Sequence, residues 1–315
     1  MDDSRGRRII ECVGLGAASL LVLASQIAVT RVLSLKYAAN QTFLVVSFAV
    51  LGLAVGAAIV AALARRWSAE RLRDLPAIGM AVFALTMLAA VVTLHLNWPT
   101  GLQIVVVPLP YVGVGVCISA LFARRAAHAG VYYACDLLGA AIGAVIATPL
   151  LDAMSAPAVL MWCVPAGFVV ALLFAPRPWR GRVHGAIGIG TVVGAALIAV
   201  GAPGWLLGPV PIYPAPIKDM LNYIERGSER AASAEVAPKL ERSRWSSFGR
   251  TDVVDDVALS QRKMLFIDGA AGTAMFADPD TLNQNTMTEL MRFGPRVALS
   301  LLPPERKQKA LAIGA

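Results

Sequence analysis

Long apolar stretches separated by short polar connections fill the first two thirds of the chain. Seven of these stretches are 19 to 25 residues long and carry few charged side chains. About 20 apolar residues in a helix cross the hydrocarbon core of a bilayer, so each stretch is predicted to be a membrane-spanning helix. The predicted segments are 9–33, 41–63, 76–96, 103–122, 131–151, 157–175 and 184–206. The pattern therefore predicts a polytopic helical bundle of six or seven spans over residues 1–206.

Arginines gather in every second connection between these segments. The groups are Arg5, Arg7 and Arg8; Arg65, Arg66, Arg71 and Arg73; Arg124 and Arg125; and Arg177, Arg180 and Arg182. The opposite loops, "LNWPTG" and "DAMSAPA", contain no Lys or Arg. Positive charge marks the cytoplasmic side, which predicts a multi-pass protein of the cell (inner or plasma) membrane with a cytoplasmic N-terminus. Segment 184–206 leaves two alternatives open: a seventh span that carries residues 207–315 outside, or a re-entrant or surface-lying segment.

The composition agrees with a protein whose main partner is the lipid bilayer. Hydrophobic residues make up 57% of the chain and charged residues 15%. The net charge of +8 arises in the membrane half, where residues 1–202 hold 14 Lys or Arg against 7 Asp or Glu. The remaining residues hold 14 against 13, so a basic surface for nucleic acid is not expected. The four cysteines and three histidines are scattered without ligand spacing, which predicts no metal site.

Small residues recur four apart within two of the predicted spans. The sequences are "GLAVGAA" from Gly52 and "GAAIGA" from Gly139. Small side chains let helix backbones approach closely, so helix packing is the favoured interpretation. A cavity lined by exposed backbone is the alternative.

Polar side chains inside the apolar segments are the candidate site residues. Arg31 lies in the first segment and Asp136 in the fifth. A lone charge is costly in hydrocarbon, and we expect these two to form an intramembrane ion pair. A structural role for the pair is favoured over a role in transport. Glu11 lies near the membrane interface, where its side chain could snorkel toward water.

The chain changes character after residue 206. Residues 207–240 are predicted to be a linker that holds a helical segment, "IKDMLNYIERGSERAASAEV". In residues 241–315, "TDVVDDVAL" and "MLFIDGAAG" are joined by the polar "SQRK", which predicts a β-hairpin. An amphipathic stretch from "DTLNQNTMTEL" onward predicts a helix, and "KALAIGA" at 309–315 predicts a buried strand. The predicted fold is mostly α: a membrane bundle, a small β element, a helix and the first strand of an incomplete Rossmann-type α/β domain.

The succession "RWSSFGRTDVVDD", "KMLFIDGAAGTAM", helix and "KALAIGA" resembles the front of the spermidine synthase-like (aminopropyltransferase) family. The spans "SQIAVTRVLSLKYAANQTFLVVSFAVLGLAVGAAIVAALARR" and "GVYYACDLLGAAIGAVIATPLL" are similar to those of its membrane-bound members. In that family an N-terminal β domain precedes a Rossmann domain that binds S-adenosylmethionine or its decarboxylated form, as in methyltransferase-like relatives.

This resemblance implies roles for three residues. Asp268 and Gly269 match the family's turn between strands, and Gly314 matches the start of its nucleotide-binding loop. The resemblance places the rest of that loop and the catalytic aspartate after Ala315, so this chain is expected to be inactive and to bind no donor by itself. The stretch after the turn does not reproduce the family's acidic polyamine-facing pattern, which leaves the substrate open. The alternative function is a transporter or structural membrane protein with a regulatory or oligomerising tail, and a homo-oligomer formed through the β element fits either function.

Overall fold

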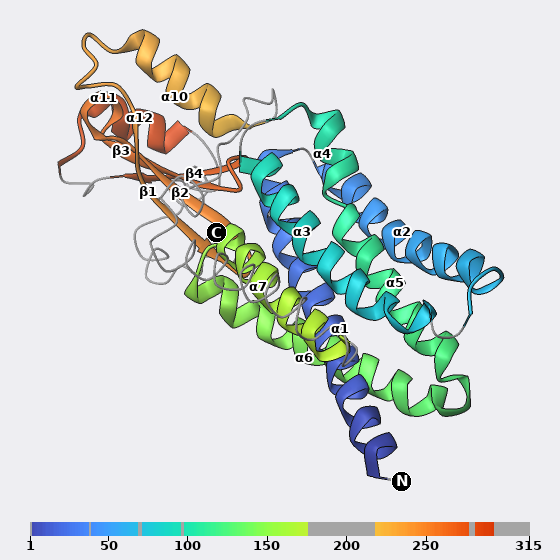
Figure 1. Cartoon of the computed structure of the whole chain (residues 1–315). Helices are drawn as coiled ribbons and strands as arrows, with labels where there is room; N and C mark the ends of the chain where they lie inside the picture. Colours follow the sequence, from blue (N-terminus) through green and yellow to red (C-terminus); the bar gives the residue numbers. More distant parts are fainter. Residues whose placement is uncertain are drawn as a thin grey trace. The chain divides into compact units, whose positions relative to one another are not determined.

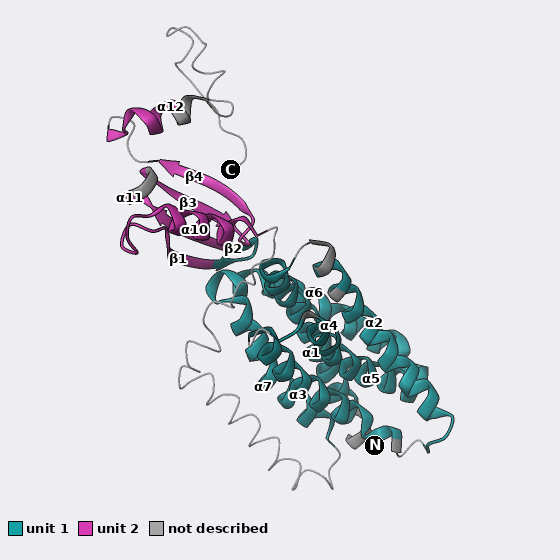
Figure 2. Ribbon diagram, turned by 90° about the horizontal axis from the view of Figure 1, so that it is seen from above, with its two compact units in different colours: residues 1–213, 245–249 teal, residues 214–244, 250–315 magenta. Residues whose placement is uncertain are grey.

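The computed structural model describes residues 2–37, 39–68, 71–95, 98–175, 218–276 and 281–292. Two predicted elements, the apolar segment 184–206 and the strand at 309–315, lie outside these residues. The chain divides into two compact units, drawn in two colours in Figure 2. The first comprises residues 1–213 with 245–249, and the second comprises residues 214–244 with 250–315.

The first unit is a bundle of long helices (Figure 1). Its helices are α1 (Asp2–Lys36), α2 (Ala39–Ala64), α3 (Leu75–His95), α4 (Thr100–Val106), α5 (Leu109–Arg124), α6 (Ala129–Ala153) and α7 (Ala156–Phe174), with short 3-10 turns η1 (Arg71–Arg73) and η2 (Ala126–His128). Six candidate membrane spans lie within the described residues, which confirms the first six predicted segments. The fourth span is divided at Pro108, because a proline donates no backbone hydrogen bond and its ring disturbs the preceding turn.

Glycines allow the helices of the bundle to pack closely. α1 packs against α6 and α7, and α5 packs against α2 and α3. A Cβ atom added at Gly139 would lie 2.0 Å from the carbonyl oxygen of Gly16, and one added at Gly56 would lie 2.4 Å from that of Val112. Both predicted small-residue spacings therefore lie at helix crossings, which confirms the packing interpretation.

The outward faces of α2 and α6 carry large apolar side chains that the protein leaves exposed. They include Phe43, Leu44, Val50, Leu51 and Val55 on α2, and Val131, Leu137, Leu138, Ile142 and Val145 on α6. A helix that is apolar all round, with one face in the protein core and the other uncovered, is typical of a bundle surrounded by lipid.

The second unit contains most of a four-stranded sheet in the order β1-β2-β3-β4. The strands are β1 (Lys239–Ser246), β2 (Gly249–Asp256), β3 (Arg262–Ile267) and β4 (Ala271–Phe276), and the helices are α10 (Asp219–Arg230), α11 (Val257–Ser260) and α12 (Gln284–Arg292). β2 and β3 pair antiparallel, with Val253 opposite Leu265 and Val254 opposite Met264. The predicted hairpin and the helix predicted within residues 207–240 are thus confirmed, whereas no Rossmann-type domain is seen in the described residues.

The edge strand β1 was not predicted from the sequence. Its residues, "KLERSRWS", include four charged side chains and lack an apolar alternation. Charged side chains are common on edge strands, where they discourage pairing with other chains. The strand conformation of β1 therefore follows from its pairing with β2 and not from the pattern of apolar and polar residues in its own sequence.

Candidate functional site

The first candidate site surrounds Glu11, two turns into α1. Only 4% of this residue is exposed, although it lies in a predicted span. A buried carboxylate in such a segment requires partners. Glu11 does not extend to water as expected. Its carboxylate is paired with several side chains inside the bundle.

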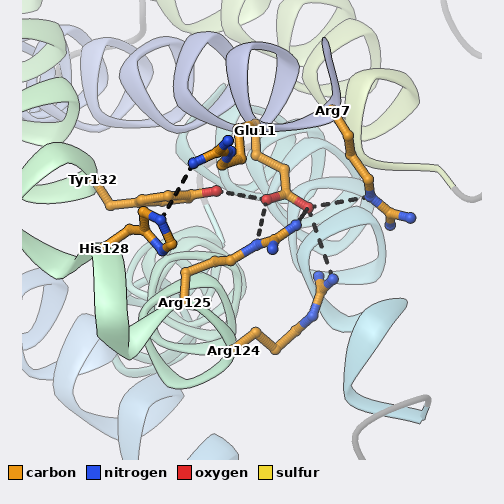
Figure 3. A network of polar contacts seen from close by, with 7 residues as sticks. Arg7, Glu11, Arg124, Arg125, His128 and Tyr132 are labelled. Carbon is orange, nitrogen blue, oxygen red and sulfur yellow. Dashed lines mark hydrogen bonds and ion pairs between the residues drawn. The ribbon is translucent and has the colours of Figure 1, made fainter. Parts of the chain in front are cut away.

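Three arginines and a tyrosine converge on the Glu11 carboxylate (Figure 3). Arg125 donates from Nε to Oε2 at 2.9 Å and from Nη2 to Oε1 at 3.2 Å, a bidentate geometry. The Tyr132 hydroxyl donates to Oε2 at 2.6 Å, and Arg7 Nε donates to Oε1 at 3.3 Å. Arg124 Nη2 lies 3.7 Å from Oε1.

One of these partners is local, and the others come from helix ends that are distant in sequence. Arg7 is one turn before Glu11 on α1, Arg124 ends α5, and Tyr132 lies in the first turn of α6. Arg8 lies within 3.2 Å of the ring of His128, which is in the turn η2 that joins α5 to α6. Arginines from the first and third of the groups that the sequence places in alternate connections thus meet around one acidic residue.

A further arginine adds to the positive charge. Arg73 ends η1, which packs against α5. The positive charges of Arg73 and Arg124 are close enough to repel each other. Among the described residues, Glu11 is the acidic side chain in contact with the group. We name Arg7, Arg8, Arg73, Arg124 and Arg125 the arginine cluster; it holds five guanidinium groups for one carboxylate.

The structure does not bring the predicted pair of Arg31 and Asp136 together. The Ser19 hydroxyl donates to Asp136, and Arg31 Nη1 donates to the Phe248 carbonyl at 3.1 Å. Ser19 and Arg31 are twelve residues apart on one helix, which corresponds to about 18 Å. α6 runs parallel to α1, as the contacts Glu11–Tyr132, Gly16–Gly139 and Leu20–Gly143 show. Asp136, near the start of α6, therefore lies beside the first half of α1 and away from Arg31.

A second polar group lies at the other end of α1. The Lys36 ammonium is fully buried and donates to the Leu94 carbonyl. The Tyr37 hydroxyl donates to the Gln103 side chain, whose amide donates to the Trp98 carbonyl at 2.8 Å. These contacts join the end of α1 to the end of α3 and to α4, so they hold together the connections at this end of the bundle.

In the second unit, Asp268 and Gly269 form the turn between β3 and β4. Both have positive φ, 51° and 70°, a conformation that Asp-Gly pairs adopt in tight hairpins. Arg250 N–H donates to the Asp268 carboxylate at 2.9 Å, while Lys218 Nζ donates to the Asp268 carbonyl at 2.8 Å. Burial lowers the pKa of Lys218, and the Asp268 carboxylate opposes that shift. The turn therefore connects β2 with the start of α10, which is a structural role.

The covered face of β2 holds a charged pair that sequence reasoning missed. Arg250 Nε donates to Asp252 Oδ1 at 2.7 Å, and the Ser243 hydroxyl donates to the same oxygen at 2.6 Å. The side chains of Arg250 and Asp252 are only 2% and 0% exposed. Farther along β2, Asp256 accepts from the Tyr223 hydroxyl of α10, and the Tyr223 ring lies 5.8 Å from that of Phe266. The available signal was the i, i+2 spacing, which places 250 and 252 on one face of a strand.

The described residues contain no group of His, Cys, Asp and Glu side chains suited to a metal ion. Gly314, the predicted start of a nucleotide loop, lies outside the described residues, as does any site for an S-adenosylmethionine-type donor built on it. Comparison with family models, curated proteins and solved structures finds no match for this chain.

Proposed function

We propose that this chain is the membrane-anchored part of a spermidine synthase-like group-transfer protein. The bundle would hold the protein in the cell membrane, with the arginine cluster and the N-terminus on the cytoplasmic side, as the positive-inside rule favours. The second unit would be the β element that precedes a nucleotide-binding domain. The proposal rests on the resemblance of the sequence to the spermidine synthase-like family.

The observation that supports it most is the arrangement of the second unit. The resemblance calls for a β element with an Asp-Gly turn before the Rossmann strand. The second unit holds antiparallel β2, β3 and β4 with Asp268 and Gly269 in such a turn. This likeness concerns architecture, and architecture alone does not determine chemistry.

The chemistry implied is transfer of a group from a sulfonium donor to a nucleophile. The nucleophile attacks the carbon bonded to sulfur, the carbon–sulfur bond breaks, and a neutral thioether leaves. Positioning the nucleophile against that carbon would supply much of the rate enhancement. Gly314 would begin the loop that holds S-adenosylmethionine or its decarboxylated form, and loop residues beyond Ala315 would complete it.

Two measurements test this proposal. The gene read past the codon for Ala315 should specify a Gly-rich loop and alternating strands and helices; a stop codon there would contradict it. The 315-residue chain in lipid nanodiscs should show no heat of binding with S-adenosylmethionine. A micromolar dissociation constant would overturn the assignment of the donor site to residues beyond Gly314.

A transporter or structural membrane protein is the second candidate. The hydrogen bond between Ser19 and Asp136 favours it, because polar contacts between spans can line a transport path. In proteoliposomes a transport role predicts that Asp136→Asn abolishes ion flux, with Asp152→Asn, at the exposed end of α6, as the matched control. Equal flux in the wild type and both variants would remove this candidate. Crosslinking in membranes would separately test whether the protein forms a homo-oligomer.

A further inference from the structure

We infer that the arginine cluster binds the phosphate group of an anionic phospholipid headgroup. The inference concerns the bundle alone and is independent of the proposed group transfer. It rests on the excess of positive charge, on an unsatisfied donor and on the position of the cluster at the helix ends.

The first step is that Glu11 has no capacity left to neutralise the cluster. A carboxylate offers about four acceptor positions. Glu11 already receives two contacts from Arg125 and one each from Tyr132, Arg7 and Arg124. The five guanidinium groups of the cluster therefore retain a net positive charge after Glu11 has been counted.

The second step concerns Arg73. Its Nε atom is buried and has no hydrogen-bond partner among the described residues. η1 is held in place by Leu72, which packs with Val60, Leu75 and Ala120 of the neighbouring helices. A buried donor without a partner is costly, and a phosphate brings several strong acceptor oxygens to such a donor.

The third step concerns the source of the phosphate. The cluster lies where α1 begins, α5 ends and α6 begins, beside the six apolar spans. The side chains of Arg7 and Arg125 are 38% and 28% exposed, so the cluster is open to a headgroup. Basic groups between spans at the cytoplasmic surface are a recognised binding site for anionic headgroups. This position favours a lipid over a soluble phosphate.

The test measures lipid retained by the whole chain. The protein is purified from nanodiscs that contain phosphatidylglycerol and phosphatidylcholine in equal amounts, and the bound lipids are counted by native mass spectrometry. We expect the wild type to retain phosphatidylglycerol in preference to phosphatidylcholine. Arg73→Gln should reduce that retention about fivefold, the effect of one basic residue near the membrane surface.

Arg65→Gln is the matched control, because Arg65 is exposed in the connection between α2 and α3 and its loss removes the same charge. It should change retention less than twofold. Arg8→Gln provides a second variant if Arg73→Gln fails to give a folded protein, judged by circular dichroism and gel filtration. Equal loss in the control and the cluster variants, or no preference for phosphatidylglycerol, would overturn the inference. Inorganic phosphate that binds in detergent and is lost in Arg73→Gln would assign the site to a soluble ligand and overturn the lipid assignment.

Discussion

The two units bury charge in different ways. In the bundle, the arginine cluster and Lys36 lie at opposite ends of α1, while the interior is closed by glycines such as Gly139 against Gly16. In the second unit, Arg250, Asp252 and Asp256 lie on the covered face of β2. Buried charged residues thus lie toward the ends of the bundle helices in the first unit and on the covered face of the sheet in the second.

The difference follows from what drives packing in each unit. Helices in lipid gain little from burying apolar surface against one another, so close approach of their backbones holds them together. A small unit has limited apolar area, and a hydrogen-bonded ion pair can occupy part of its core. The bundle should therefore be most sensitive to added volume, and the sheet to a removed charge.

The largest effect is expected from added volume at the crossing of α1 and α6. Gly139→Leu would place its Cβ within 2.0 Å of the Gly16 carbonyl, so the two helices would have to separate. We expect loss of the folded, monodisperse species in gel filtration. Gly130→Leu is the control on the same helix, since no atom lies within 4 Å of a Cβ at Gly130. A folded Gly139→Leu protein with wild-type thermal stability would contradict this account of the bundle.

The next effect is expected from the charged pair of the sheet. Asp252→Ala would remove the carboxylate that the buried Arg250 guanidinium contacts at 2.7 Å, at a cost of about 3 to 5 kcal/mol. Hydrogen exchange of the β2 and β3 amides in the full chain should accelerate accordingly. The double variant Arg250→Met with Asp252→Leu should restore much of the protection. Protection in Asp252→Ala equal to that of the wild type would show that the pair contributes nothing.

A smaller effect is expected from Glu11→Ala in the bundle. The cost should be about 2 kcal/mol, below the range for fully buried pairs, because Arg7 and Arg125 keep part of their hydration. Denaturant unfolding in detergent would measure it. Tyr132→Phe removes one hydrogen bond and no charge, and should cost about 1 kcal/mol. If Glu11→Ala cost more than Asp252→Ala, the comparison between the two units would be reversed.

The smallest effect is expected from Tyr223→Phe, at about 1 kcal/mol at neutral pH. Burial and the bond to Asp256 raise the pKa of Tyr223. Above the ordinary tyrosine pKa of about 10, the unfolded chain loses this proton before the folded one does, so this contribution to stability falls as pH rises. The stability difference between wild type and variant, followed by hydrogen exchange of α10, should be constant below about pH 10 and shrink above it. A difference that grows there would contradict the sign.

Local signals along the chain were sufficient to predict the long helices and the hairpin. Runs of about 20 apolar residues leave few alternatives to a spanning helix, since a backbone in lipid must satisfy its own hydrogen bonds. The short runs "TDVVDDVAL" and "MLFIDGAAG", which hold Val, Leu, Phe and Ile and are joined by polar residues, likewise indicate β2 and β3. These signals are local, and they hold without knowledge of what packs against them.

The contacts between charged residues depend on how the helices pack together. Sequence reasoning paired Arg31 with Asp136 because both interrupt apolar segments. However, α1 and α6 run parallel, so Asp136 near the start of α6 bonds Ser19 in the first half of α1 and lies away from Arg31. Sequence reasoning also expected the Glu11 side chain to reach water. It contacts Arg124 and Arg125 instead, which are more than 110 residues away along the chain. A periodic pattern indicates whether each segment is surrounded by lipid, water or protein. An ion pair such as Glu11 with Arg125 depends instead on which helix ends pack side by side, and the order of the segments along the chain does not specify that.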